Sequence, residues 1–285
     1  MGSGAATARQ GNPLGALLKR WRTLRGVSQL DLALTADVSA RHLSFLETGR
    51  SKPSREMLLL LGSALDLPLR EQNSLLQAGG FSAVYRETAL EDPQMGGIRH
   101  ALELILRQHE PFAAVAVDRH WDVVMVNAPY AQLLGGLLEP SKAPAPMMLI
   151  PPPRLNALRL LFDPQGFRPH LANWSAIARD ILSRLQREAL SSTDQVSSSL
   201  LEELLGAPGV PADWREPSLE KPPSLVLPFE IRLGECSARF FTTLTTLGAP
   251  QDVTLQELRI ESFHPADAET ERMIRGAAKQ SAPSE

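Results

Sequence analysis

Residues 28–54 read SQLDLALTADVSARHLSFLETGRSKPS and contain three candidate helix starts separated by short turns. Ser28 stands before the first helix start, and Asp31 follows three residues later. This spacing resembles the capping box, in which the side chains of two residues three apart each bind the other's backbone N–H at a helix N-terminus. Ser39 is the second candidate cap and Ser54 is the third. The stretch therefore predicts two short helices and the beginning of another.

Apolar residues on both sides of this stretch extend the helical pattern. Before it, leucines and a tryptophan recur at three- and four-residue steps, at Leu14, Leu17, Leu18, Trp21 and Leu24. After it, one helix should follow Ser54 and another should follow Pro68. The sequence thus predicts five short helices within residues 12–80. This order is typical of a helix-turn-helix domain, whose third helix enters the major groove of DNA.

The same domain resembles the phage-repressor and Cro-like (XRE) DNA-binding domains. The resemblance rests on SQLDLA at 28–33, VS at 38–39 and LETGRSKPS at 46–54, which occur in the family's order and spacing. Asp37 departs from the glycine that is usual in the turn, but aspartate tolerates a left-handed backbone better than most residues. The resemblance implies that the partner is a double-stranded DNA operator, bound by a homodimer at two half-sites.

The resemblance also implies which residues contact DNA. Gln29 begins a helix, where backbone N–H groups favour a phosphate, and Arg50 and Lys52 should add phosphate contacts. On the third helix, Arg41 could read guanine and Phe45 could touch a thymine methyl group. A solvated surface charge is the alternative for Arg41. The predicted DNA-binding residues are Gln29, Ser39, Ala40, Arg41, Ser44, Phe45, Arg50 and Lys52.

Other residues of this domain have structural interpretations. The family pattern implies that Arg22 pairs with Glu47, and Trp21 should belong to the core. Leu30 and Leu34 stand at positions that are often charged in relatives. They either cover a neighbouring surface, such as the second domain or a dimer partner, or pack in the core.

The charge of the chain is unevenly distributed. Of the 285 residues, the first 85 carry ten Lys or Arg and six Asp or Glu, and the remainder carry nineteen and twenty-six. The front is therefore +4 and the back is −7, which indicates that only the front faces a polyanion. The length and the hydrophobic share of 43% favour two domains with buried cores.

The cysteine count and the apolar runs bear on the compartment. A single cysteine, Cys236, excludes an internal disulfide framework and a Cys-rich zinc module, and it is typical of a reducing compartment. No apolar run approaches the roughly 20 residues that span a bilayer, and residues 1–11 lack the apolar stretch of a signal peptide. We expect a cytoplasmic protein without a membrane partner, whose residues 1–11 are disordered and tag-like.

The rest of the chain predicts a connector over 81–97, a second domain over 98–270 and a flexible tail over 271–285. Apolar patterns rich in β-branched residues predict five strands, at 112–117, 121–126, 225–233, 240–246 and 255–263. Helical patterns lie at 98–108, at 127–136 and, chiefly, at 154–162, 172–190 and 195–205. A hairpin, inserted helices and three returning strands predict a five-stranded antiparallel sheet with helices on one face, in the PAS-like order. The fold class is therefore multidomain, α followed by α+β.

Three stretches of this second domain, 111–135, 156–174 and 240–265, resemble the MmyB-like regulators. This family couples an XRE domain to a PAS-like ligand-binding domain. The most distinctive piece is TTLGAPQDVTLQELRIE at 245–261. The resemblance implies a small, fatty-acid-like effector, and we expect no other cofactor.

An acyl chain needs an apolar slot with a few polar groups at one end. The predicted wall consists of Trp121, Phe162, Trp174 and Phe241. The predicted polar end consists of Arg159, which could pair with a carboxylate, and Asn156 one helical turn earlier. The alternatives are plain core packing for the aromatic residues and a bridge from Arg159 to an acidic surface residue.

Motifs for catalysis are missing, so we predict that the protein is not an enzyme. The sequence has no nucleophile elbow, phosphate-binding loop or His-Glu-x-x-His metal site. A haem or metal sensor remains an alternative, through the histidines His100, His109, His120, His170 and His264. A second alternative is an antitoxin-like interaction protein whose second domain binds a protein partner.

Overall fold

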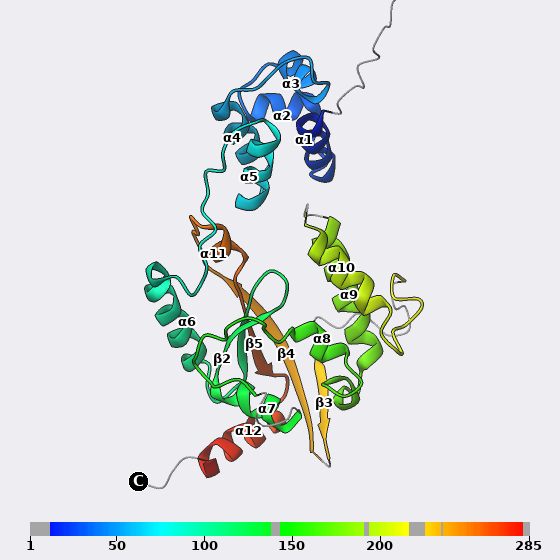
Figure 1. Ribbon diagram of the computed structural model, residues 1–285. Helices are drawn as coiled ribbons and strands as arrows, with labels where there is room; N and C mark the ends of the chain where they lie inside the picture. Colours follow the sequence, from blue (N-terminus) through cyan, green and yellow to red (C-terminus); the bar gives the residue numbers. More distant parts are fainter. Residues whose placement is uncertain (1–11, 138–142, 191–193, 217–225, 235, 282–285) are drawn as a thin grey trace, which may run out of the picture. The chain divides into compact units, whose positions relative to one another are not determined.

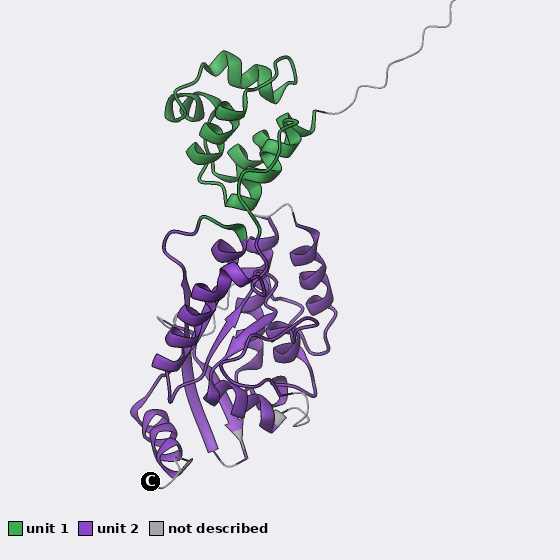
Figure 2. Ribbon diagram, turned by 60° about the vertical axis from the view of Figure 1, so that its left-hand side comes forward, with its two compact units in different colours: residues 1–87, 251–253 green, residues 88–250, 254–285 purple. Residues whose placement is uncertain are grey.

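The computed structural model describes residues 12–137, 143–190, 194–216, 226–234 and 236–281, which form two compact units (Figures 1 and 2). Unit 1 comprises residues 1–87 and 251–253, and unit 2 comprises residues 88–250 and 254–285. The predicted disordered segment 1–11 lies outside the described residues. None of the described helices combines the length and the apolar character needed to cross a membrane.

Unit 1 contains the five predicted helices (Figure 1). They are α1 (Pro13–Leu24), α2 (Gln29–Thr35), α3 (Ala40–Glu47), α4 (Arg55–Ala64) and α5 (Leu69–Ala78). Ser28, Ser39 and Ser54 each accept a hydrogen bond from a backbone N–H inside the helix that follows. These caps confirm the three helix starts, because each one satisfies a donor that the first turn leaves unpaired.

The turns and the core of unit 1 follow from single residues. Asp37 has the predicted left-handed backbone, with φ of 52°. Gly15 lets α1 approach α3 closely, since a Cβ there would lie 2.3 Å from the carbonyl oxygen of Glu47. Trp21 is buried, as predicted. Leu30 and Leu34 are 59% and 71% exposed, so the alternative that they pack in the core is wrong.

The first residues of the predicted connector 81–97 are bound to unit 1. The amide oxygen of Asn73 accepts hydrogen bonds from the backbone N–H groups of Val84 and Tyr85, which ties this segment to α5. The backbone oxygen of Arg86 accepts a hydrogen bond of 2.8 Å from the N–H of Val253. Unit 1 therefore extends to residue 87 and includes three residues from far along the chain.

Unit 2 is built on a five-stranded antiparallel sheet, which confirms the predicted class. Its strands are β1 (Ala114–Val117), β2 (Val123–Val126), β3 (Phe229–Leu233), β4 (Cys236–Thr246) and β5 (Arg259–Pro265), in the order β2-β1-β5-β4-β3. The last strand begins later than predicted, because Val253–Glu257 form the short helix α11. Gln256 and Glu257 favour helix over strand, which explains this difference.

Helices cover both faces of the sheet rather than one. On one side lie α7 (Ala128–Leu137), α8 (Ala157–Phe162), α9 (Trp174–Leu190) and α10 (Gln195–Leu205), and on the other lies α6 (Gly96–Gln108), which follows the short helix η1 (Pro93–Met95). Val115 and Val117 pack in the first core, whereas Ala114 and Ala116 pack in the second. Strand β1 is buried on both faces, so its sequence is uniformly apolar instead of alternating.

The predicted tail is also a helix over most of its length. Residues 268–281 form α12 (Ala268–Ser281), which packs against β4 and β5. The guanidinium of Arg275 lies 5.0 Å from the ring centre of Phe112, and the hydroxyl of Thr270 accepts a hydrogen bond from the N–H of Arg239. These contacts order a segment whose own composition is mostly polar.

Candidate functional site

Arg41 and Phe45 on α3 and Arg50 in the segment after it form a cluster of two arginines and one aromatic ring. The guanidinium of Arg41 lies 5.3 Å from the ring centre of Phe45, and that of Arg50 lies 6.0 Å from the same ring. Both arginines are exposed, whereas the ring is half-buried. An arginine held beside an aromatic face keeps its donors available for base edges or phosphates. The arrangement suits the predicted reading of guanine and a thymine methyl group.

All eight residues predicted to contact DNA lie on α2, on α3 and its cap, or in the segment after α3. Those on the surface are Ser39, Arg41, Arg50 and Lys52, and those half-buried are Gln29, Ala40, Ser44 and Phe45. Their side chains are thus placed where a helix-turn-helix domain presents DNA contacts. The contacts themselves stay predictions.

Glu47 links α1, α2 and α3. Its carboxylate accepts hydrogen bonds from Arg22 Nε at 2.7 Å, Arg22 Nη2 at 3.1 Å and Gln29 Nε2 at 2.7 Å. Burial opposes its charge, but the hydrogen bonds and the positive charge of Arg22 outweigh burial and lower the pKa of Glu47. The predicted pairing of Arg22 with Glu47 is confirmed. Since the amide nitrogen of Gln29 is bound to Glu47, a phosphate contact at Gln29 would use the backbone N–H at the start of α2.

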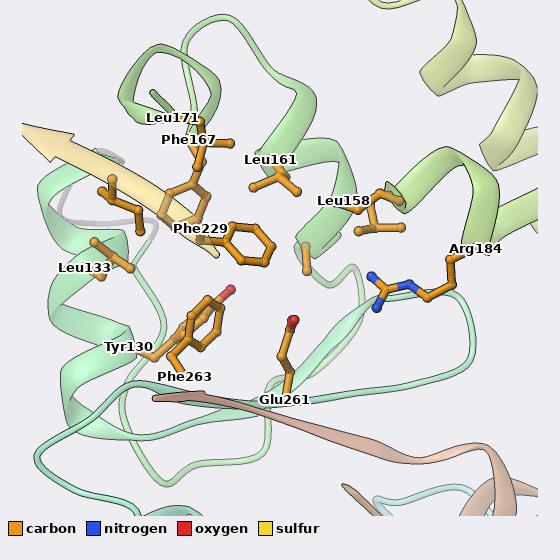
Figure 3. A pocket seen from close by; sticks show the side chains of 13 residues that line it. Tyr130, Leu133, Leu158, Leu161, Phe167, Leu171, Arg184, Phe229, Glu261 and Phe263 are labelled. Carbon is orange, nitrogen blue, oxygen red and sulfur yellow. The ribbon is translucent and has the colours of Figure 1, made fainter. Parts of the chain in front are cut away.

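Unit 2 holds an apolar pocket with about 40 Å³ of free space between the sheet and helices α7, α8 and α9 (Figure 3). Its lining residues are Tyr130, Leu133, Ala157, Leu158, Leu161, Phe167, Leu171, Ile181, Arg184, Phe229, Ile231, Glu261 and Phe263. Ten of these thirteen carry neither a charge nor a hydroxyl group. The lining is that of a small-molecule site, but the free space would hold only a few water molecules, so a larger ligand would enter only as the lining side chains move apart.

Three polar side chains reach this pocket. Glu261 on β5 is only 8% exposed and points into the space (Figure 3). Burial raises the pKa of its carboxyl, and the charge of Arg184 and a hydrogen bond from Thr242 offset only part of this. Burial and the charge of Glu261 both raise the pKa of the Tyr130 hydroxyl. Both groups are therefore held in surroundings that disfavour negative charge.

Arg184 supplies the positive charge at the pocket. Its guanidinium lies 4.6 Å from the ring centre of Trp121, and its end turns toward the pocket (Figure 3). Its Nε is buried and has no hydrogen-bond partner in the described part of the chain. A buried donor without a partner is costly, so this group is a candidate for contact with a ligand.

None of the six residues predicted to bind the ligand lines this pocket. Trp121 is buried between two arginines, with Arg259 5.3 Å from its ring on the β5 side. Asn156 caps α8, because its side-chain oxygen accepts hydrogen bonds from the N–H groups of Leu158 and Arg159. Trp121 therefore packs beside Arg184, and Asn156 holds the start of α8, so both support the pocket without lining it.

The other four also have different partners. Arg159 is exposed and binds Glu203 at 2.8 Å, the surface bridge that was its alternative. Phe162 and Trp174 pack edge to face at 4.8 Å, and Trp174 borders a separate open hollow with Arg168. Phe241 stacks on His264 at 5.0 Å. Because neighbouring strand residues point to opposite faces, Phe240 packs in the core on the pocket side and Phe241 does not.

The sequence pattern of β5 does not identify Glu261 as a pocket residue. In residues 258–261 the apolar Leu258 and Ile260 alternate with the charged Arg259 and Glu261, a pattern that predicts Glu261 on the solvent face. Period-two alternation places Phe263 on the same face as Glu261, and Phe229 on the same face as Ile231. Helices α7, α8 and α9 cover this face, and their packing buries Glu261.

The histidines named for a haem or metal site do not converge. His109 and His264 are neighbours, with ring centres 4.8 Å apart. His120 binds Asp194 at 2.8 Å, and His170 contacts the backbone oxygen of Arg232. His100 lies near Glu103 on α6. The described residues therefore assemble no site from the five histidines.

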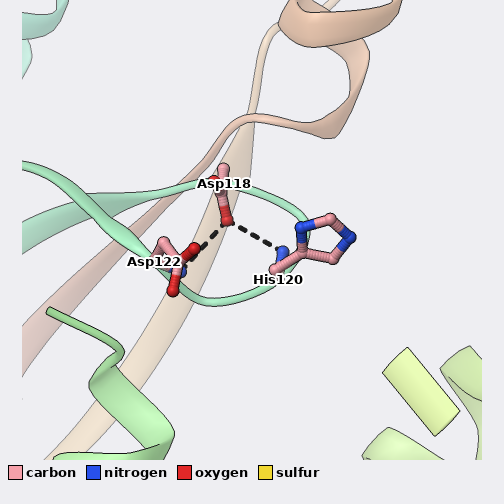
Figure 4. Close-up of side chains that lie close together, drawn as sticks. All are labelled: Asp118, His120 and Asp122. Carbon is pink, nitrogen blue, oxygen red and sulfur yellow. Dashed lines mark hydrogen bonds between the residues drawn. The ribbon is translucent and has the colours of Figure 1, made fainter. Parts of the chain in front are cut away.

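Asp118, His120 and Asp122 form a tight group at the turn between β1 and β2, with candidate ligating atoms within 4.8 Å of one another (Figure 4). The carboxylate of Asp118 accepts hydrogen bonds from the backbone N–H groups of His120 and Asp122, at 2.8 and 3.0 Å. The carboxylate of Asp122 accepts one from Asn156 Nδ2 at 2.8 Å. These bonds shape the turn, as in an Asx turn, and account for the group without a metal.

Comparison with known families places both units. The description "MmyB-like transcription regulator ligand binding domain" matches residues 98–276, and "Helix-turn-helix" matches residues 18–72. No curated protein matches the chain. A solved structure titled "Structure of an RNA-binding Light-Oxygen-Voltage Receptor" aligns with 97% of this chain and 66% of its own, at 11% identity and a TM-score of 0.24, too weak a likeness to indicate fold or function. Since the ligand-binding-domain match spans more than half of the 285 residues, the chain belongs to the family of MmyB-like transcription regulators.

Proposed function

We propose that this ligand-responsive, DNA-binding transcription regulator binds its operator as a homodimer through α3 and senses a fatty-acid-like molecule in unit 2. The pocket of Figure 3 carries the second half of the proposal, because it combines apolar walls with a polar end at Glu261 and Arg184. The proposed action is binding without catalysis. It would take place in the cytoplasm, where DNA is available and the exposed thiol of Cys236 stays reduced.

An elongated apolar ligand suits the chemistry of the lining. Leu158 and Leu161 of α8 face Phe229 of β3, and Leu133 extends the wall along α7 (Figure 3). Burying each methylene of an acyl chain against such walls contributes about 0.8 kcal/mol. The polar side chains would then orient the head of the ligand.

Sensing requires that the ligand bind one arrangement of the regulator better than another. The proposal therefore predicts that operator DNA and ligand alter each other's affinity by the same factor. A ligand that binds both arrangements equally well would not regulate, however tight its binding.

The test uses an operator selected by the protein from a random DNA pool, with decanoic acid as the probe. Decanoic acid should change operator affinity in the wild type. Leu161→Trp fills the pocket and should abolish the response while retaining operator binding in the absence of the acid. Leu190→Trp, at an exposed position at the end of α9, is the matched control and should respond like the wild type.

An unchanged response in Leu161→Trp would show that the pocket is not the sensing site. Native mass spectrometry of the purified protein provides an independent check. A co-purified lipid supports the proposal, whereas an empty unit 2 with a stable protein partner supports the interaction-protein alternative.

A further inference from the structure

The polar end of the pocket has one acidic and one basic side chain. Glu261 comes from β5 and Arg184 from α9, and both side chains turn toward the space between them (Figure 3). They are the two charged residues among the lining residues that the structure describes. In the described part of the chain, no ion pair within 4.0 Å joins Glu261 to Arg184. The pocket thus offers an acceptor and a donor that a ligand could bridge.

We propose that Glu261 and Arg184 form a head-group site that selects neutral polar heads, which carry a hydrogen-bond donor as well as an acceptor, over carboxylates. A primary amide or a protonated carboxylic acid has such a head. This inference rests on the proposed function, namely that the pocket binds a ligand with an acyl chain.

The reason is the hydrogen-bonding inventory of the two side chains. A guanidinium only donates, and a carboxylate only accepts. An amide head can accept from Arg184 through its oxygen and donate to Glu261 through its nitrogen. A carboxylate head can satisfy Arg184, but it offers no donor to Glu261 and places a second negative charge beside it in surroundings of low polarity.

A fatty acid can therefore bind this site in one way that balances charge. The ligand carboxylate and Glu261 share one proton, which is taken up from solvent when both groups are ionised beforehand. Burial already raises the pKa of Glu261, which makes the shared proton less costly to hold. Affinity for the acid should then fall with rising pH, and affinity for the amide should not.

The other groups around Glu261 do not supply this proton. Tyr130 from α7 stays neutral, because its pKa is raised by burial and by Glu261. Thr242 from β4 contributes an uncharged hydroxyl. The pocket residues of α8 and β3 are apolar. A pH dependence of acid binding would thus report on the pair formed by Glu261 and the ligand.

The experiment compares decanoic acid with decanamide by isothermal titration calorimetry on the full chain, from about pH 5.5 to pH 8.5. Each titration is repeated in buffers of different ionisation enthalpy, which gives the number of protons taken up. The acid should take up about one proton, with its affinity falling about tenfold per pH unit above the pKa of Glu261. The amide should take up none and keep its affinity.

Variants separate this site from the rest of the protein. Glu261→Gln should bind decanoic acid without proton uptake and with the same affinity across the pH range. Glu203→Gln removes a carboxylate from the exposed pair with Arg159 and should behave like the wild type. The wild-type proton count does not depend on either variant.

Two outcomes would overturn the inference while leaving the proposed function intact. One is acid binding without proton uptake and as tight as amide binding at high pH. The other is wild-type proton uptake in Glu261→Gln. If neither ligand binds, or if Leu161→Trp leaves their binding unchanged, the proposed function itself fails and this inference fails with it.

Discussion

The guanidinium of Arg22 on α1 donates two hydrogen bonds to the carboxylate of Glu47 at the end of α3, from Nε to Oε1 at 2.7 Å and from Nη2 to Oε2 at 3.1 Å. The side chain of Glu47 is 3% exposed and that of Arg22 is 14% exposed. The pair therefore fixes the base of α3 in a position shielded from water.

Replacing Glu47 by Gln should lower the free energy of unfolding of unit 1 by about 3 kcal/mol, because the guanidinium is left buried without its charge partner. Hydrogen exchange of the α1 and α3 amides in the full chain measures this. Glu203→Gln breaks an exposed arginine pair and should cost less than about 1 kcal/mol. Equal effects of the two variants would contradict a buried role for Glu47.

The same pair predicts acid sensitivity. The pKa of Glu47 is lowered in the folded state, so its unfolded form binds a proton more readily. The stabilisation is complete above the unfolded pKa of about 4.3 and is lost as the pH falls through the folded value. Acid titration of the wild type should show this loss, and Glu47→Gln should lack it.

The two arginines beside Phe45 should contact different parts of the DNA, Arg41 a base and Arg50 the phosphates. Arg41→Ala should remove about 1 to 3 kcal/mol of discrimination at one base position. Arg50→Ala should weaken binding to all sequences alike and reduce the slope of log affinity against log salt by about one. Binding to a selected operator and its single-base variants over a salt series measures both. Unchanged sequence preference in Arg41→Ala would exclude it from base contact, and an unchanged slope would exclude Arg50 from the phosphates.

Asn127 should be critical for the start of α7. Its side chain is fully buried, and its oxygen accepts from the N–H groups of Ala114 and Tyr130 at 2.9 and 3.1 Å. Its nitrogen donates to the backbone oxygens of Phe112 and Leu106 at 2.8 and 3.3 Å. This side chain joins β1, α6 and α7, well beyond the helix cap that its position suggests.

Asn127→Asp keeps the shape but loses both donors and buries a charge, so it should lower the free energy of unfolding of unit 2 by about 3 kcal/mol. Thermal unfolding followed by near-UV circular dichroism measures this. Gln132→Glu makes the same change of amide to acid at an exposed position of α7 and should be neutral within about 0.5 kcal/mol. A neutral effect of Asn127→Asp would mean that water reaches the site.

Leu30 and Leu34 should contribute little to the stability of unit 1. Replacing both by Lys should change the free energy of unfolding by less than about 0.5 kcal/mol each, whereas Leu32→Ala, in the core of the same helix, should cost about 3 kcal/mol. Unfolding of the variants measures this, and a large loss at Leu30 or Leu34 would contradict it. Sedimentation of the double variant then shows whether this face of α2 mediates self-association.

The helices of unit 1 could be predicted because their signals are local. Ser28, Ser39 and Ser54 each cap a helix within three residues of themselves, so no distant contact is needed to place them. The five strands and their antiparallel class could also be predicted, since the apolar patterns and their order along the chain limit the possible pairings.

The ligand site could not be predicted from residue type alone. Phe240 and Phe241 are equivalent in composition, and only the register of β4 against β5, with Phe241 opposite His264, decides which one faces the pocket side. Arg159 is the obvious partner for a carboxylate, but its place on α8 turns it outward to Glu203. Arg184 lies on a long helix with several charged neighbours, and only tertiary packing selects it.

The bond between the backbone of Arg86 and Val253 bears on any attempt to exchange parts between regulators of this family. Because residues 251–253 belong to unit 1, the chain passes from one unit to the other after residues 87, 250 and 253. In a chimera joined once, after residue 87, residues 1–87 would come from one regulator and residues 251–253 from the other. The two parts of unit 1 would then not match. A working chimera would have to take residues 251–253, which lie between β4 and β5, from the same protein as residues 1–87.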